Sequence, residues 1–266
     1  MIFLLIVYGL IAGSFLTAYT YRLPIGMSIK KGRSICPNCK KKISWYDNIP
    51  LLSFILLKGK CRKCGKKISI RYPLIEFVAV TGFVGIYYLL NSCGTNSMLS
   101  ASYVCSWQAR LGTLTLPFML LVFLTVLAIF IIDLEKRIIP DELSFFGLAL
   151  IFLSLLLIDP SVLYIHLLSG FGAAIFILLI HIVTSGKGMG LGDVKLALYI
   201  GAFLGWPGTA VWLFGAFLTG AIVGSILILI KKTSFGRQIA FGPFLILSLI
   251  ITLIWGEALL RWYLLF

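Results

Sequence analysis

The sequence predicts an all-α polytopic membrane protein with about eight transmembrane helices and a small cytoplasmic zinc-binding insert. The chain is 60% hydrophobic and only 12% charged, and its apolar runs repeatedly approach the ~20 residues that a helix needs to cross a bilayer. No alternation of apolar and polar residues suggests a barrel. Helices must therefore satisfy the backbone hydrogen bonds inside the membrane.

Residues 1–21 form the first predicted span. A secretory signal peptide carries basic residues ahead of its apolar stretch, and none precedes this one, so we expect the span to be retained. Its basic flank begins at Arg22. The positive-inside rule therefore places the N-terminus outside and the following loop in the cytoplasm.

The remaining apolar runs predict seven further spans and place the C-terminus outside as well. If the spans alternate, every Lys and Arg except Arg110 and Arg261 lies in a cytoplasmic loop. The sixth span has about 15 residues and a rise of only ~22 Å, so we expect it to be thin, partly re-entrant or packed within protein. The seven spans are residues 72–91, 113–133, 142–158, 161–183, 193–207, 209–230 and 239–260.

The net charge of +14 would suggest a nucleic-acid partner in a soluble protein. In this chain the excess positive charge lies beside the predicted spans, where anionic lipids attract it. We therefore expect anionic membrane lipids as partners and no nucleic acid.

Residues 22–71 are the main polar insert and carry two C-x-x-C pairs, Cys36 with Cys39 and Cys61 with Cys64. Their spacing is typical of a four-thiolate zinc site. Four protein ligands leave no open position, so we expect a structural Zn²⁺ ion. Redox pairs or disulfides are the alternative, but a cytoplasmic loop is kept reducing.

Two further cysteines, Cys93 and Cys105, fall on the opposite side of the membrane in this topology. An oxidising compartment would allow a disulfide between them. The sequence leaves open whether they form this bridge or remain free thiols.

Two aspartates are candidate catalytic residues, since an ionisable group in or beside a span is costly. Asp133 ends the span 113–133, and Asp193 begins the span 193–207, so both should lie at the same depth on the cytoplasmic face. Two adjacent carboxyl groups share one proton, so that one acts as a base towards water while the other protonates the substrate. This is the chemistry of an aspartic protease.

The surroundings of Asp193 favour an extended substrate. Gly190 and Gly192 precede it, and without Cβ atoms they would let a peptide lie beside the acid. The structural alternatives are that Asp193 caps a helix and that Asp133 pairs with Lys136 or Arg137. We expect Asp141, which follows a proline, to be the N-cap of the span 142–158.

Several motifs together resemble those of the bacterial prepilin peptidases, which are membrane aspartic proteases with a G-x-G-D sequence. The resemblance covers nearly the whole chain. It is carried by Asp133 to Asp141, Gly190 to Asp193, the four insert cysteines, Gly13 to Leu16, Tyr21 to Pro24, Arg71 to Glu76 and Phe241 to Phe244.

The resemblance implies cleavage after the glycine that ends a basic leader, on type 4 prepilins or type II secretion pseudopilins. The reaction would take place at the cytoplasmic face of the bacterial inner membrane, with Asp133 and Asp193 as catalytic residues. Many members also N-methylate the new N-terminus with S-adenosylmethionine, which assigns this activity to the insert and residues 72–91. Glu76 is a candidate contributor, whereas Thr17 stands where the family usually has asparagine.

Three other interpretations of the sequence differ from this assignment. A presenilin-like intramembrane protease also has a G-x-G-D aspartate, but its first motif is typically Tyr-Asp, whereas Ile132 precedes Asp133 here. A proton- or cation-coupled transporter, or a scaffold for pilus or secretion assembly, could also use two acids near the membrane. We expect His166 and His181 to be packing or interfacial residues.

Overall fold

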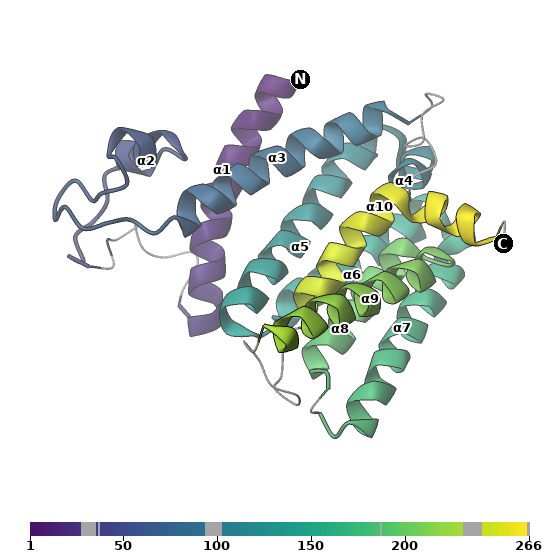
Figure 1. The fold of residues 1–266 in the computed structure, drawn as a ribbon. Helices are drawn as coiled ribbons and strands as arrows, with labels where there is room; N and C mark the ends of the chain where they lie inside the picture. The colour runs from purple at the N-terminus through teal and green to yellow at the C-terminus, as the bar shows by residue number, and fades with distance from the viewer. Residues whose placement is uncertain (28–35, 37, 94–102, 187, 231–240, 265–266) are drawn as a thin grey trace. The chain divides into compact units, whose positions relative to one another are not determined.

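The computed structural model describes residues 1–27, 36, 38–93, 103–186, 188–230 and 241–264 (Figure 1). These residues form helices joined by turns and loops, and no β-strand occurs among them. The chain divides into two compact units, Met1–Tyr88 and Leu89–Phe266, which are described separately.

The first unit consists of two long helices, α1 and α3, and the insert between them. The helices approach closely because Gly9 and Gly13 lack side chains. An ideal Cβ would lie 2.9 Å from the Cα of Val80 at Gly9 and 2.8 Å from the Cα of Glu76 at Gly13. The elements are α1 (Ile2–Arg22), a 3₁₀ turn (Leu23–Ile25), a second 3₁₀ turn (Trp45–Asn48), α2 (Leu52–Leu56) and α3 (Arg71–Asn91), whose last residues belong to the second unit.

The second unit is a bundle with α8 at its centre. Helix α8 packs chiefly on α7 and α6, and α10 packs on α9. The side chains of Leu196, Ala197 and Ile200 in α8 are inaccessible to solvent. The helices are α4 (Tyr103–Leu111), α5 (Thr115–Lys136), α6 (Asp141–Ile158), α7 (Leu163–Val183), α8 (Leu191–Leu204), α9 (Gly208–Leu229) and α10 (Gly242–Leu264).

Seven helical segments of the described chain are long and apolar enough to cross a membrane. They coincide with seven of the eight predicted spans, which confirms an all-α polytopic membrane protein. Helix α8 is the eighth, and its 14 residues rise only about 21 Å. It begins two residues before the predicted limit and ends three residues earlier, so the expected short segment is shorter still.

The short helix α8 can end inside the bundle because side chains of other elements satisfy its last carbonyl groups. Most of these carbonyls have no partner within the helix, although Gly201 O also accepts from the Gly205 N–H at 2.9 Å, and burying such groups unpaired would be costly. Three donors reach them: Thr209 Oγ1 to Gly201 O at 3.1 Å, His166 Nδ1 to Ala202 O at 2.7 Å and Trp107 Nε1 to Phe203 O at 3.2 Å.

His166 is therefore more than a packing residue. Its Nδ1–H must donate to the Ala202 carbonyl, so its Nε2 accepts from Arg110 Nη1, 2.8 Å away. The ring is 4% exposed and links Arg110 to the end of α8. This arrangement selects the neutral tautomer with its proton on Nδ1.

Replacing His166 by leucine should destabilise the bundle. The Ala202 carbonyl would lose its donor and Arg110 its acceptor, and a buried group left unpaired costs about 1–3 kcal/mol. His166→Asn is the matched control, because its amide nitrogen can take the place of Nδ1. Thermal unfolding in detergent should show a lower midpoint for the leucine variant, and equal midpoints for the two variants would contradict this role.

Candidate active site and metal centre

Asp133 lies in the last turn of α5. Its carboxyl group is buried, with the residue 5% exposed, and Oδ2 has no hydrogen-bond partner in the described part of the chain. Arg137 ends the helix in the left-handed conformation and donates its N–H to the Asp133 carbonyl, 2.9 Å away. Among the described residues, Asp133 forms no ion pair with Lys136 or Arg137, so that structural alternative does not account for its carboxyl group.

Asp193 is the third residue of α8 and is 7% exposed. Its Oδ2 accepts a hydrogen bond of 3.0 Å from the backbone N–H of Gly190. Asp193 therefore does cap the helix, as the structural alternative held, because its carboxyl group closes the first turn. This contact engages one carboxyl oxygen and places the group at the positive end of the α8 dipole.

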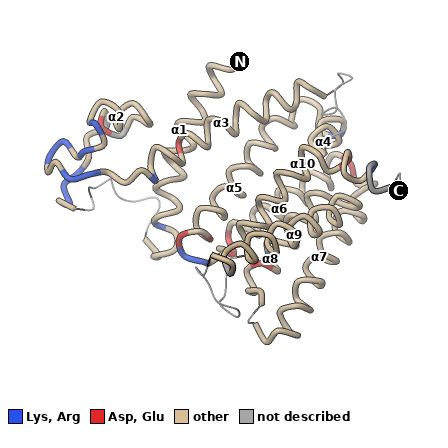
Figure 2. The backbone as a smooth tube through the Cα atoms, in the orientation of Figure 1, with Lys and Arg blue, Asp and Glu red and all other residues tan. Residues whose placement is uncertain are grey.

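The structure brings the segments that carry Asp133 and Asp193 to the same end of the second unit. Figure 2 shows acidic positions at this end, where α5 ends and α8 begins. Ile139 lies between the two segments. An ideal Cβ would lie 3.0 Å from Ile139 Cβ at Gly192 and 3.6 Å from Ile139 Cδ1 at Gly242.

Gly242, the first residue of α10, adjoins the Asp133 carboxyl group directly. An ideal Cβ at this position would collide with Oδ2 of Asp133. The chain therefore needs glycine here for the carboxyl group to occupy its observed position. From the sequence, the Phe241 to Phe244 motif was predicted only as a family feature, with no role at the site.

The two glycines of the expected substrate groove differ in their surroundings. At Gly190 an added Cβ would meet only Asp193 Oδ2 at 3.6 Å and the Gly192 nitrogen at 3.9 Å, so there is open space beside the acid. At Gly192 the same atom would press against Ile139. Gly190 is thus compatible with a groove, whereas Gly192 is required for packing.

Two side chains hold the segments that carry the aspartates. Lys195 Nζ of α8 pairs with Asp141 Oδ1 at 2.5 Å, and Asp141 is the first residue of α6. Asp141 is therefore not the N-cap, which is Pro140, and that prediction was wrong. His181 Nδ1 lies 2.6 Å from the Met189 carbonyl, next to Gly190, and anchors the turn before α8.

In the first unit, Cys36, Cys39, Cys61 and Cys64 form one cluster. Their sulfur atoms all lie within 4.8 Å of one another, and the sulfurs of Cys36 and Cys64 are 3.9 Å apart. Four sulfurs placed tetrahedrally about 2.3 Å from a Zn²⁺ ion would be about 3.8 Å apart. The cluster therefore fits a four-coordinate ion.

Electrostatics also favour a cation at this cluster. The backbone of Lys66 lowers the pKa of the Cys64 thiol through a hydrogen bond, but desolvation and the other three thiols raise it to about 11. The sulfurs can therefore carry negative charge together at neutral pH only when a cation compensates it.

Replacing Cys61 by serine should remove the metal. We expect about one zinc ion per wild-type chain and close to none in the variant, because the site loses one of its four thiolates. Elemental analysis of the purified protein measures this directly. Cys105→Ser, which removes a sulfur outside the cluster, should retain the ion, and a metal-free wild-type protein would contradict the assignment.

A cavity of about 1040 Å³ in the first unit adjoins the cysteine cluster and is lined in part by Thr17, Arg22 and Glu76. Glu76 is 7% exposed, and its Oε2 accepts a hydrogen bond of 2.8 Å from the Leu51 backbone, so it holds the insert. Thr17 donates to the carbonyl of Ser14 in its own helix.

Cys93 and Cys105 form a disulfide, which answers the question that the sequence left open. The bond ties the segment after α3 to α4. Helix α4 holds Cys105 and immediately precedes α5, whereas Asp133 lies in the last turn of α5. The disulfide and Asp133 therefore lie towards opposite ends of α5.

Fold and site together define a multi-pass α-helical membrane protein with two buried aspartates at one end of its bundle and a four-cysteine centre in its insert. The bacterial peptidase A24 N-terminal domain matches residues 7–90, and the type IV leader peptidase family matches residues 118–225. The chain belongs to the bacterial prepilin leader peptidase family and is a protease.

Curated relatives match along almost their entire length. Proteins named prepilin leader peptidase/N-methyltransferase from Legionella pneumophila and Aeromonas hydrophila are each 32% identical to it, over 96% and 98% of this chain and 92% and 93% of their own. The protein of that name from Bacillus subtilis is 30% identical over 99% of this chain and 98% of its own. No solved structure matches.

Proposed function

We propose that this protease uses Asp133 and Asp193 to cleave the basic leader from type 4 prepilins or pseudopilins, after the glycine that ends it. The observation that carries the proposal is that two buried carboxyl groups from distant parts of the chain lie at the same end of the second unit, with Ile139 between their segments. Among the described residues, a backbone N–H donates a hydrogen bond to the carboxyl group of Asp193, whereas none reaches Oδ2 of Asp133. The relatives' names supply the class of substrate.

The unequal surroundings of the two acids suggest their roles. The Gly190 N–H and the start of α8 stabilise a negative charge on Asp193, so Asp193 is the base that takes a proton from the attacking water. Asp133 has an oxygen that no described donor reaches and lies beside a negative neighbour, so it holds the shared proton. It passes this proton to the carbonyl oxygen or the leaving amine of the substrate.

We assign the aspartates to the cytoplasmic face of the bacterial inner membrane. Disulfides persist in oxidising compartments, and the Cys93–Cys105 disulfide lies towards the end of α5 that is remote from Asp133. The basic insert supports the same orientation, because Lys and Arg favour the cytoplasmic side and attract anionic lipids. Figure 2 shows that Lys and Arg residues gather on the insert.

The second proposed activity is N-methylation of the new N-terminus. The relatives' names include it, and the cavity beside the cysteine cluster offers a place for S-adenosylmethionine, which would supply the methyl group. Thr17 cannot provide the amide found in the family. Four sulfur ligands would leave the zinc ion no open coordination position, so its role would be structural only.

The test is an assay with the purified protein and a prepilin that carries a basic leader. The expected product is a mature chain that begins directly after the leader's glycine, identified by mass spectrometry. With S-adenosylmethionine present, its N-terminal peptide should gain the mass of one methyl group. Cleavage without this gain would reject only the second activity, whereas an intact precursor would reject the proposed function.

A further inference from the structure

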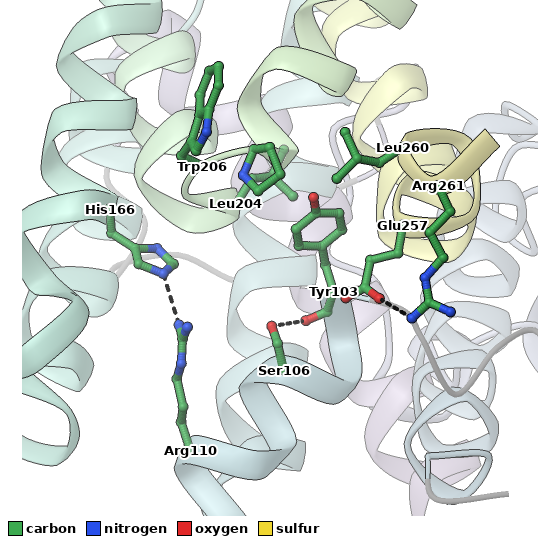
Figure 3. A pocket seen from close by; sticks show the side chains of 10 residues that line it. Tyr103, Ser106, Arg110, His166, Leu204, Trp206, Glu257, Leu260 and Arg261 are labelled. Atoms are coloured by element: carbon green, nitrogen blue, oxygen red, sulfur yellow. Dashed lines mark hydrogen bonds and ion pairs between the residues drawn. The ribbon is translucent and has the colours of Figure 1, made fainter. Parts of the chain in front are cut away.

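A second cavity, of about 280 Å³, lies in the second unit among α4, α10 and the turn between α8 and α9 (Figure 3). It is far from the proposed catalytic residues. Helix α5 begins at Thr115, near α4, and about 27 Å of helix separates this residue from Asp133. The proposed cleavage of prepilins does not involve this cavity.

Tyr103 supplies a buried polar group that has no partner within the described chain. Its ring fits between two glycines, since an ideal Cβ would lie 2.7 Å from Tyr103 Cε1 at Gly208 and 2.8 Å from Cε2 at Gly256. The residue is only 7% exposed, and no described residue forms a hydrogen bond with its hydroxyl group. Such a group needs a compensating acceptor. The hydroxyl group has less than 1 Å² of accessible surface, so a ligand in the cavity that Tyr103 lines reaches it when the neighbouring side chains shift.

The cavity wall carries both signs of charge. Glu257 Oε2 and Arg261 Nη2 are 3.7 Å apart, beyond hydrogen-bonding distance, so this pair leaves both groups with unused hydrogen-bonding capacity. Arg110 also lines the cavity but is occupied by His166 and by Asp159, 3.5 Å away. A ligand that matches Glu257 and Arg261 together carries an ammonium group and an anionic group.

The rim of the cavity is apolar. Leu204, Leu260 and Trp206 line it, and Trp206 is 69% exposed (Figure 3). The cavity lies at the ends of spanning helices, where lipid headgroups meet aromatic side chains. A ligand with a charged head and apolar chains fits both the wall and the rim.

We propose that this cavity binds the headgroup of a phosphatidylethanolamine lipid. The phosphate accepts from Arg261 and from the Tyr103 hydroxyl, and the primary ammonium donates to Glu257. The acyl chains extend out of the cavity along Trp206 and Leu260. Phosphatidylcholine should bind less well, because its quaternary ammonium has no N–H to donate.

Native mass spectrometry of the full-length, delipidated protein in detergent tests this site. Wild-type protein should retain phosphatidylethanolamine about tenfold more strongly than phosphatidylcholine or phosphatidylglycerol, which corresponds to about 1.4 kcal/mol. Glu257→Gln should remove the preference over phosphatidylcholine, and Tyr103→Phe should weaken binding of phosphatidylethanolamine. Glu142→Gln and Tyr164→Phe, which change exposed residues outside the cavity, should behave as wild type.

Several results would overturn the site. These are equal retention of the three lipids by wild-type protein, a preference that survives Glu257→Gln, and binding that is unchanged in Tyr103→Phe. Competition by free phosphoethanolamine as effective as that by the lipid would show that the acyl chains contribute nothing and would refute a lipid ligand. Cleavage of a prepilin by the same variants checks that they are folded.

Discussion

The variants Asp133→Asn and Asp193→Asn are each expected to reduce cleavage of a prepilin by about 10³-fold or more, because each removes one member of the acid–base pair. The two side chains are nearly isosteric, and the amide oxygen introduced by Asp193→Asn could still accept from the Gly190 N–H, so the fold should persist. Steady-state cleavage by the purified variants measures the loss. The zinc content should stay at the wild-type level in both.

The two aspartates should also fail to act independently. When two groups act as one unit, removing either one costs nearly as much as removing both, so the double variant should be little slower than each single variant. Glu142→Gln is the matched control, because it changes an exposed acid in the same region that has no part in the site. Near-normal cleavage by either single variant would refute the proposed mechanism.

After the aspartate variants, Gly242→Ala should cause the largest loss of cleavage activity. Its methyl group would occupy the place of Asp133 Oδ2, and the carboxyl group would have to move. A displacement of about 1 Å at a reacting group can cost about 10²-fold in rate. We expect kcat to fall by that order, with the protein still folded.

Gly172→Ala provides the comparison for this variant. Gly172 lies within α7, and an added Cβ there would meet nothing within 4 Å. The change should leave cleavage intact and slightly favour the helix, since alanine is the better helix former by about 1 kcal/mol. Equal kcat values for the two alanine variants would show that Gly242 does not position Asp133.

The chain's apolar runs and its motifs were sufficient to predict most of the architecture. Seven spans follow from run length and composition, because a bilayer demands long apolar helices whatever their neighbours are. The cysteine cluster follows from two short local spacings.

Features that depend on distant partners were missed. Nothing in the sequence shows that His166 donates to Ala202, that His181 anchors Met189 or that Lys195 pairs with Asp141. Asp141, the expected N-cap, is instead the first residue of α6, and Pro140 is the N-cap. Hydrogen-bond partners of polar side chains are set by which helices lie next to each other, and this information is spread over the whole chain.

By itself, the sequence determined the helical class, the membrane environment, the four clustered cysteines and the two candidate acids, because residue type and local spacing dictate each of them. Only the tertiary structure decided that Gly242 adjoins Asp133, that Asp193 accepts from Gly190, that Cys93 bonds to Cys105, and that α8 ends inside the bundle. The physical reason is that packing brings together groups tens of residues apart. Their contacts depend on three-dimensional shape rather than on any local pattern.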